Sequence, residues 1–429
     1  MLACLRAQDI TGFETIVVTN TPPDTKSSLL PKPLNIIQFD QNNIAKARNL
    51  GIQAARREFL AFCDDDALPD PGWLRKIMTV FENSNIGGAS GFTRGRNGIS
   101  PQWGGVITNQ LAQETKIKLQ KTTVFEPDAG SAPILIGTNC AFRKSALAQI
   151  GNFDEGFSYY LDDSDISLRL SQAGWALAVL PDCQVHHSFA ASAVRHKNRV
   201  PKSLLALGRS KAYFCKKHAQ GLQIQPALDE FCDTQNKRLN RHFLLGQISS
   251  SGMRELQETL QTGFTQGAQY LIGLNENKPK PRGKDIPLYD DNSSKHIVLA
   301  GRPRDHNKIS KMAKALVTAG NRVSVILLGY SPKYMQVSFE HCGYWRHSGG
   351  QFGKINRSEP IWRWMGFKTK ALLECQRIAK TRPIDFITFL DSGDFNASLL
   401  PQKFEMSSLN GYNVLVDSAL WSEQDNKHQ

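Results

Sequence analysis

Short apolar runs rich in β-branched residues alternate along this chain with segments of helical periodicity, and this alternation most constrains the fold. Residues 13–20 (FETIVVTN), 34–40 (LNIIQFD) and 58–63 (EFLAFC) are typical of buried strands that are closed by turn residues. Between the second and third runs, residues 43–57 carry apolar side chains at helical spacing, and Asn43 stands at the start of the helix. Strands that alternate with helices predict an α/β fold with a largely parallel sheet covered by helices.

The alternation continues to residue 187 and begins again near residue 295. Further strands are predicted at GASGFTRG, ILIGTNCAFR and WALAVLPDCQVHHS, and later at HIVLAG, RVSVILLG, IDFITFL and YNVLVDS. Residues 194–217 and 226–273 are predicted to be helical, whereas residues 275–294, rich in proline, glycine and charge, are the best linker candidate. A chain of 429 residues is too long for one core, so more than one domain is expected.

Charge and cysteine usage limit the partners and the compartment. The formal net charge of +13 predicts an anionic partner, either nucleic acid, phospholipid headgroups or a phosphorylated substrate. Nucleic acid is disfavoured because no binding motif accompanies the charge. The 8 scattered cysteines form no C-x-x-C pair and predict a reducing, cytoplasmic setting. No signal pattern and no apolar run of about 20 residues is present, so membrane contact would be peripheral.

The basic stretch from Arg195 to His218 allows two interpretations. It mixes lysine and arginine with Leu204, Tyr213 and Phe214, among other apolar residues. One interpretation is a solvated helix face. The other is a surface that docks on an anionic membrane, on the inner face of the cell membrane.

Three consecutive acids, Asp64, Asp65 and Asp66, follow the predicted strand at residues 58–63. Ligands of open parallel sheets bind beyond the carboxyl ends of the strands. Mutual repulsion of carboxylates raises their pKa values or attracts a cation, and oxygen ligands suit Mg²⁺ or Mn²⁺. Alternation along an extended segment would turn Asp64 and Asp66 one way and Asp65 the other. The alternative is a solvated turn before Pro69.

A second acidic cluster, Asp162, Asp163 and Asp165, opens a predicted helix. Capping accounts for one acid and a pair with Arg169 for another, so at least one remains to act as a general base. Two histidines, His186 and His187, end a predicted strand, and alternation lets only one of them face the first acids.

Taken together, these segments resemble the family 2 glycosyltransferases of the GT-A fold over about residues 1–220. The resemblance rests on FETIVVTN, NNIAKARNLGIQAARREFLAFCDDDALPDPGWL, GTNCAFRKSALAQIGNFDEGF and YLDDSDISLRLSQAGWALAVLPDCQVHH, in that order. A weaker resemblance links residues 295–429 to the N-terminal half of GT-B glycosyltransferases of the family 4 type, through HIVLAGRPRDHNKISKMAKALVTAGNRVSVILLG and RPIDFITFLDSGD.

The resemblance assigns roles to individual residues. Asp64 and Asp66 would be the outer acids of a D-x-D motif around Asp65, binding a divalent metal and the donor diphosphate. Asp163 would be the catalytic base, beside Asp162, which stands where the family usually has glutamate. His187 matches a late metal ligand of the family better than His186 does. The remaining donor-site residues would be Asn20 and Arg48.

The implied activity is inverting transfer of a sugar from a nucleoside-diphosphate sugar, with Mn²⁺ or Mg²⁺, to a glycan or lipid-linked hydroxyl acceptor in envelope or surface polysaccharide synthesis. Two features depart from the family. The chain begins inside the helix MLACLRAQ, without the usual first strand, and Thr19 replaces the acid that follows VV. Both departures affect nucleotide binding, so the alternative is an inactive or truncated homologue with a binding or scaffolding role. A nucleotidyl-transfer enzyme that uses the same acids is a third interpretation.

The predicted architecture is therefore α/β throughout. Residues 1–220 should form a GT-A-like, Rossmann-like domain with a mixed, mostly parallel sheet and flanking helices. Residues 221–294 should form a helical connector and linker, and residues 295–429 a second, smaller Rossmann-like α/β domain.

Overall fold

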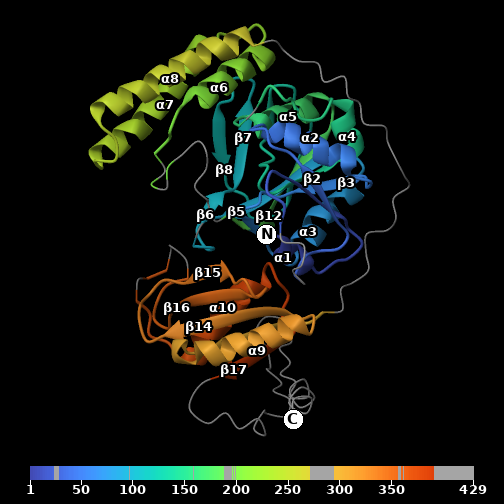
Figure 1. Cartoon of the computed structure of the whole chain (residues 1–429), viewed down its shortest axis with the longest axis vertical. Coiled ribbons are helices and arrows are strands. Elements are labelled where there is room, and N and C mark those ends of the chain that lie inside the picture. Colours follow the sequence, from blue (N-terminus) through green and yellow to red (C-terminus); the bar gives the residue numbers. More distant parts are fainter. Residues whose placement is uncertain are drawn as a thin grey trace.

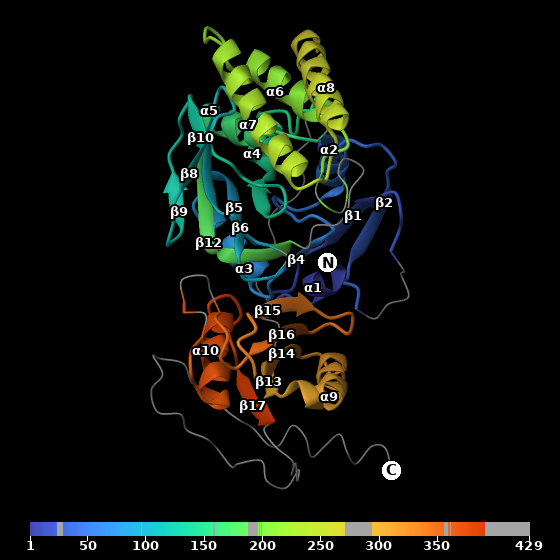
Figure 2. The same cartoon turned by 90° about the vertical axis from the view of Figure 1, so that its left-hand side faces the viewer.

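The computed structural model describes residues 1–23, 29–95, 97–157, 159–187, 196, 198, 200–270, 294–355, 359–360 and 362–390. Figure 1 and Figure 2 show three layers along the long axis, with a helical region at the top, an α/β region in the middle and a second α/β region at the bottom. The mixed α/β class predicted from the sequence is observed. The predicted strand YNVLVDS (residues 412–418) and most of the linker candidate lie outside the described residues.

The N-terminal region is built on one large sheet and two small ones. Its strands are β1 (Thr15–Thr19), β2 (Leu34–Gln38), β3 (Phe59–Phe62), β4 (Ala67–Pro69), β5 (Ile86–Arg94), β6 (Pro101–Trp103), β7 (Gly105–Asn109), β8 (Glu114–Ile117), β9 (Thr123–Phe125), β10 (Ser131–Pro133), β11 (Cys140–Arg143) and β12 (Ala176–His187). The seven-stranded sheet has the order β3-β11-β5-β12-β4, with β6 and β9 at its margins. Strands β5 and β12 pair in parallel, whereas β11, β4, β6 and β9 pair antiparallel to their neighbours. Strands β1 and β2 form a separate parallel pair, and β10-β7-β8 the third sheet.

Helices cover both faces of the large sheet. They are α1 (Leu2–Arg6), α2 (Ile44–Ala54), α3 (Trp73–Thr79), α4 (Lys144–Gln149) and α5 (Asp162–Gln172). Helix α2 begins where the sequence predicted, because the Asn43 side chain accepts a hydrogen bond from the Lys46 amide at 3.0 Å. One apolar core lies between the sheet and α2, α4 and α5, and a second lies between the sheet and α3. The sheet is therefore buried on both sides, as the continuous apolar runs indicated.

The segment from residue 134 to 143 differs from the prediction. A strand was expected over ILIGTNCAFR, but only Cys140–Arg143 is a strand. The preceding residues form a turn in which the Asn139 amide donates to the Ile136 carbonyl at 2.8 Å. Asn139 then satisfies neighbouring backbone groups, donating to the carbonyls of Phe92 and Cys183 at 2.9 and 3.0 Å. The buried Asn139 side chain thus makes some of the hydrogen bonds that a longer strand was expected to make with its neighbours.

The helical region consists of α6 (Leu205–His218), α7 (Gln225–Leu244) and α8 (Ser250–Gln269). Helices α6 and α8 touch at glycines: a side chain at Gly208 would collide with the backbone of Leu260. The apolar residues of the basic stretch lie in cores, with Leu204 and Phe214 0% exposed and Tyr213 1% exposed. The membrane-surface interpretation is therefore wrong for these apolar side chains, whereas Lys202 and Lys216 of the same stretch are exposed.

The C-terminal region is a smaller sheet between two helices. Its elements are β13 (His296–Gly301), α9 (His306–Thr318), β14 (Arg322–Gly329), β15 (Gln336–Phe339), β16 (Trp345–Gly350), α10 (Phe367–Ala379) and β17 (Phe386–Leu390). The order is β15-β16-β14-β13-β17, and every pair except β15-β16 is parallel. One core lies on each face, under α9 and α10.

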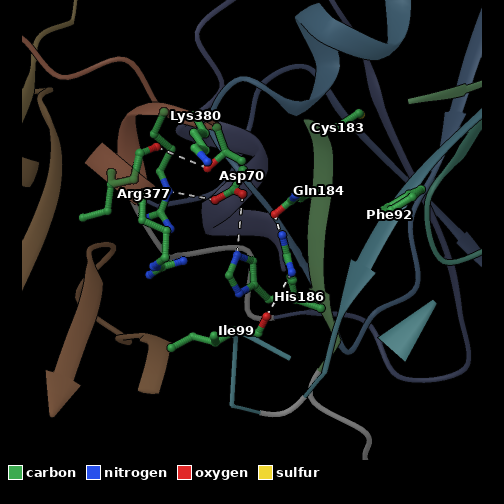
Figure 3. Close-up of polar contacts among 12 residues, drawn as sticks. Asp70, Phe92, Ile99, Cys183, Gln184, His186, Arg377 and Lys380 are labelled. Atoms are coloured by element: carbon green, nitrogen blue, oxygen red, sulfur yellow. Dashed lines mark hydrogen bonds and ion pairs between the residues drawn. The ribbon is translucent and has the colours of Figure 1, made fainter. Parts of the chain in front are cut away.

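A buried polar cluster joins the N-terminal and C-terminal regions. The Arg382 guanidinium contacts the Asp70 carboxylate, with 2.8 Å between Nε and Oδ1, and both side chains are 1% exposed. His186 lies 3.5 Å from the other Asp70 oxygen, and its ring packs on Trp345. In Figure 3, Asp70 and His186 face the residues of the C-terminal region, including Arg377. The two regions are therefore held together by charge as well as by apolar contact.

A cavity separates β1 from β3. It has a volume of about 230 Å³ and is lined by residues of both strands, by α2 and α3, and by Met1 and Leu5 near the N-terminus. Strand β1 pairs on one side with β2, and β3 pairs on one side with β11. Among the described residues, the two sheets are thus not joined by a shared ladder at this position.

Candidate active site

Asp64 and Asp66 lie in a tight turn between β3 and β4. The Ala67 amide donates to the Asp64 carbonyl at 3.1 Å and closes the turn. The sequence predicted an extended segment here, but the turn has the same effect on the side chains. Asp65 is exposed, whereas Asp64 and Asp66 are partly buried, with side chains 30% and 23% exposed.

His187, the last residue of β12, completes a group that could hold a metal ion. One ligand atom each from Asp64, Asp66 and His187 lies within 4.8 Å of the others, and His187 Nε2 is 2.9 Å from Asp66 Oδ1. Two carboxylates and one imidazole are a donor set that suits Mn²⁺, and the carboxylates also suit Mg²⁺. The residues therefore fit the cation that the sequence implied.

Neighbouring polar groups orient these three side chains. Thr138 donates to Asp64 Oδ2 at 2.6 Å. Gln102 Nε2 lies 3.1 Å from His187 Nδ1, which leaves Nε2 facing Asp66. A partner on the second ring nitrogen fixes the ring orientation of a metal-binding histidine.

His186 points away from the acids. It is 6% exposed and lies against Asp70 and Trp345 on the other side of β12. The expected alternation therefore places one histidine in the site and the other in the contact with the C-terminal region.

The second acidic cluster forms the first turn of α5. Its N-cap is Leu161, which adopts a left-handed conformation with φ of 68°, so no aspartate side chain caps the helix. Asp162 is buried, and Asp163 is 22% exposed at the side chain. The acids are thus placed in the helix rather than before it, where they favourably meet the positive end of the helix dipole.

Arg48, from α2, connects the two acidic clusters. Its Nη1 contacts Asp162 Oδ2 and lies 3.2 Å from Asp163 Oδ1, while its Nη2 lies 3.9 Å from Asp64 Oδ1. Residues separated by about a hundred positions in the sequence are therefore brought together around one guanidinium. Burial disfavours its charge, but Asp162, Asp163 and Asp64 together raise the pKa of Arg48 above its usual value.

The Arg48 guanidinium has space only because residue 137 is a glycine. A Cβ at Gly137 would overlap the terminal nitrogens of Arg48. The Phe153 ring supports the guanidinium, with 5.1 Å between Cζ and the ring centroid. Packing thus leaves Arg48 little freedom to leave the acids.

The pKa of Asp163 lies in the range expected of a proton acceptor. Burial and the neighbouring Asp162 raise the pKa of Asp163 from 3.8 to about 7, against the opposing effects of Arg48 and of a hydrogen bond from the Gly137 amide. A carboxyl group with a pKa near neutrality can exchange a proton efficiently at physiological pH.

Asp165 has a different environment from Asp163, two residues away. It pairs with Arg169 at 2.6 Å, as predicted, and also with Lys217 and His218 at 2.8 Å each. Burial opposes its charge, but Arg169 and Lys217 hold the pKa of Asp165 well below its usual value. This acid anchors α6 to α5.

Asn20, assigned to the donor site, lies at the exposed end of β1. Its described contacts are with Thr21 and Gln38 rather than with the acids. Three residues that contact the site were not singled out: Gln102, Gly137 and Thr138. A polar threonine and a glycine in the apolar run ILIGTNCAF were a signal for the last two, whereas nothing in the local sequence marked Gln102.

Part of this chain is similar to known proteins. Residues 1–151 match the family model described as glycosyl transferase family 2. The chain is 35% identical over 89 residues to N-acetylglucosaminyl-diphospho-decaprenol L-rhamnosyltransferase of Mycobacterium tuberculosis, covering 21% of this chain and 28% of that protein. It is 26% identical over 201 residues to the pre-mycofactocin glycosyltransferase of the same organism, covering 42% of this chain and 41% of that protein. The chain thus spans less than half the length of these relatives.

Solved structures show weaker likeness. One of them is GalNAc-T7 with UDP, GalNAc and Mn²⁺, with a TM-score of 0.35, 15% identity and coverage of 47% of this chain and 43% of that chain. TarS 1-349 of S. aureus in complex with UDP has a TM-score of 0.35 and 17% identity, covering 57% of this chain and 67% of that chain.

Proposed function

We propose, on the premise that the N-terminal region is of the family 2 glycosyltransferase type, that the protein transfers a sugar from a nucleoside-diphosphate sugar to a hydroxyl acceptor with inversion. The observation that carries the proposal is the meeting of Asp163 with Asp64 across Arg48. A proton acceptor and a metal-binding group then share one site, as metal-assisted displacement requires.

Asp64, Asp66 and His187 would hold Mn²⁺ or Mg²⁺. When bound, the ion supplies neutralisation of the charge that develops on the departing diphosphate. Thr138 and Gln102 keep Asp64 and His187 oriented for this purpose. Arg48, already paired with acids, contributes mainly by positioning them.

Asp163 is the proposed general base. The acceptor oxygen attacks the anomeric carbon, its proton passes to the Asp163 carboxylate, and the bond from that carbon to the diphosphate oxygen breaks, so that nucleoside diphosphate leaves with the electron pair. A pKa raised to about 7 makes the carboxylate more basic than an ordinary aspartate. Asp162 assists by keeping Arg48 in place and by raising the proton affinity of Asp163.

The class of acceptor is inferred from a relative rather than from the geometry of the site. One relative is named for a diphospho-decaprenol substrate, which supports a glycan or lipid-linked acceptor and a role in envelope or surface polysaccharide synthesis at the cytoplasmic side of the membrane. No described helix is long and apolar enough to cross a membrane. We also propose that the chain has three domains, at residues 1–220, 221–294 and 295–429.

The test is a screen of nucleoside-diphosphate sugars with Mn²⁺, in which release of nucleoside diphosphate is measured with and without acceptor. Asp66→Asn should abolish release because it removes a metal-binding carboxylate. Asp65→Asn is the matched control, since Asp65 is the exposed acid of the same turn and is not part of the group that could hold the metal, so its loss should lower release far less. Full turnover in Asp66→Asn would refute the site, and release of pyrophosphate would instead indicate nucleotidyl transfer.

A second candidate is an inactive homologue with a binding role. The position of Asn20 favours it, because this residue was assigned to the donor site but its described contacts are with Thr21 and Gln38 rather than with the acids. This candidate predicts that a nucleoside diphosphate binds, measured by calorimetry, while no sugar in the screen is turned over.

A further inference from the structure

Exposed aromatic side chains gather on one part of the C-terminal region. Among the described residues, Trp364 is 77% exposed, Tyr330 74%, Tyr334 49% and Trp362 45%. All four carry a polar N–H or O–H group on an apolar ring. Large exposed apolar side chains that cluster, rather than occurring singly, mark an interaction surface.

These residues belong to one surface, which we call the aromatic face: Tyr330, Tyr334, Phe352, Trp362 and Trp364. It lies in the loops that follow β14 and β16 and in the segment that precedes α10. Backbone hydrogen bonds join the loops, from the Phe352 amide to the Ser331 carbonyl at 3.2 Å and from the Arg363 amide to the Phe352 carbonyl at 3.1 Å. The aromatic face is therefore a built part of the fold.

Ring packing orders the two tryptophans. Phe352 stacks on Trp362 with 5.2 Å between ring centroids, and lies 4.8 Å from the Trp364 ring. The tryptophan rings themselves meet edge to face at 5.5 Å. Rings held in this way lose little conformational entropy when they meet a partner.

Positive charge surrounds the aromatic face. Arg302 is buried between Tyr330 and Phe367, with its guanidinium 4.1 and 4.3 Å from the ring centroids. Lys354 lies 4.8 Å from the Tyr334 ring. Further exposed cations are Arg304, Lys333, Arg363 and Lys368.

The same described loops also carry two acids, and one of them offsets the charge of Arg304. Asp305 lies 3.7 Å from Arg304, and Glu359 accepts a hydrogen bond from the Ile355 amide at 2.8 Å. Cations thus outnumber acids around the aromatic face, and the balance is complementary to a negatively charged surface.

We propose that the aromatic face docks the protein on an anionic phospholipid membrane. Tryptophan and tyrosine rings settle at the level of the lipid headgroups, where their apolar and polar parts are both satisfied. Nearby lysine and arginine side chains add electrostatic attraction to anionic lipid. A membrane also suits aromatic residues ringed by cations better than a neutral glycan does, because the glycan offers nothing for the charges to bind.

The proposal moves the membrane contact from the basic stretch at residues 195–218 to the C-terminal region. The apolar side chains Leu204, Tyr213 and Phe214 of that stretch are buried and cannot enter a bilayer. Docking does not depend on the glycosyltransferase proposal, since none of the aromatic face lies among the acids.

The experiment is sedimentation of the full chain with vesicles of phosphatidylcholine alone or mixed with phosphatidylglycerol at low salt. We expect binding to the anionic vesicles only, and a loss of affinity of at least about tenfold in the double variant Trp362→Ser/Trp364→Ser. Leu244→Ser is the matched control, because Leu244 is 83% exposed on α7, away from the aromatic face, and binding should be unchanged. Lys333→Gln/Lys368→Gln, which keeps the rings, should weaken binding to anionic vesicles and make it less sensitive to salt.

Quenching by brominated acyl chains reports insertion directly. Tryptophan fluorescence should be quenched in the wild type on anionic vesicles and much less so in the double variant. The melting temperature of the double variant is measured in parallel and should be unchanged if the variant folds. Equal binding to both vesicle types, an effect of Leu244→Ser as large as that of the double variant, or displacement by a soluble oligosaccharide would overturn the proposal. Turnover of a soluble acceptor should be the same in the double variant, so failure of docking and failure of the glycosyltransferase proposal are distinguishable.

Discussion

Two buried acidic centres of this protein, the one around Asp163 and the one around Asp70, use the same residue type in opposite ways. At Asp70, burial opposes the charge, but Arg382 and His186 outweigh it and hold the pKa of the carboxyl well below its usual range. At Asp163, burial and Asp162 prevail over Arg48, and the pKa is raised to about 7. One carboxylate is fully compensated and joins two regions, while the other shares its single cation with other acids and remains able to take a proton. Compensation, rather than burial, therefore separates a structural acid from a chemical one.

The largest expected effect is on catalysis. Asp163→Asn removes the proposed proton acceptor without changing the shape of the side chain, so turnover should fall by about 10²- to 10⁴-fold. The melting temperature should stay the same or rise, because a repulsive neighbour of Asp162 is removed. Steady-state kinetics and thermal denaturation measure the two effects. If Asp163→Asn loses stability and retains turnover, Asp163 is a structural acid rather than a chemical one.

The next effect is on stability. Arg382→Met leaves the buried Asp70 carboxylate without its cation, which should cost about 3–5 kcal/mol of unfolding free energy. Arg56→Met is the control, because Arg56 pairs with Glu14 while its own side chain is 74% exposed, and such a pair contributes about 0–1 kcal/mol. Denaturant unfolding measures both. Equal destabilisation by the two variants would show that the buried Asp70 carboxylate does not need the Arg382 cation.

The pH dependence of turnover sharpens the comparison. Only the ionised Asp163 carboxylate accepts a proton, so turnover should rise about tenfold per pH unit below pH of about 7 and level off above it. A plateau that already begins near pH 5 would contradict the raised pKa.

The pH dependence of stability should have opposite signs at the two centres. Because the pKa of Asp163 is raised in the folded protein, its contribution to stability is present below the ordinary value of 3.8 and is lost as the pH rises through about 7. Because the pKa of Asp70 is lowered, its contribution is present above 3.8 and is lost as the pH falls. Melting curves of Asp163→Asn and the wild type should therefore diverge as the pH increases from 4 to 7, and parallel curves would count against the assignment.

The smallest effect concerns the metal-binding group. Gln102→Leu removes the partner of His187 Nδ1 and should weaken Mn²⁺ binding by about tenfold. Binding is followed by electron paramagnetic resonance of free Mn²⁺, with Asp65→Asn as the control. Affinity that drops in both variants alike would indicate general charge attraction instead of an oriented ligand.

Local sequence was enough for the elements that position the site, but not for its connections. Strand β3 and helix α5 follow from an apolar run and from helical spacing, whereas a turn at Asp64–Asp66 replaces the extended segment that was predicted there. Alternation along β12 also separated His186 from His187. The bridge through Arg48 could not be derived from spacing, because it joins α2 to α5 across the sheet. Its assignment to the site came from family resemblance, which gave the donor as its partner rather than the acids.

The contact between the N-terminal and C-terminal regions was also beyond the reach of sequence patterns. In the sequence, Asp70 stands between two prolines and Arg382 precedes a proline, and neither position marks a buried ion pair. Each is 1% exposed, and the two are in contact. Apolar periodicity predicts which residues are buried by their own element, whereas a buried ion pair depends on two distant segments meeting.

The cavity between β1 and β3 has a consequence for how the molecule responds to compression. Packing around this cavity of about 230 Å³ is incomplete, and opening of the surrounding chain lets water fill imperfectly packed space, so the open form should occupy less volume and be favoured as hydrostatic pressure increases. Amides of β1 and β2 should consequently lose their nuclear magnetic resonance signals at lower pressure than those of β5 and β12. The beginning of β1, where Thr15 and Ile16 line the cavity, would then be the first part of the large α/β region to open.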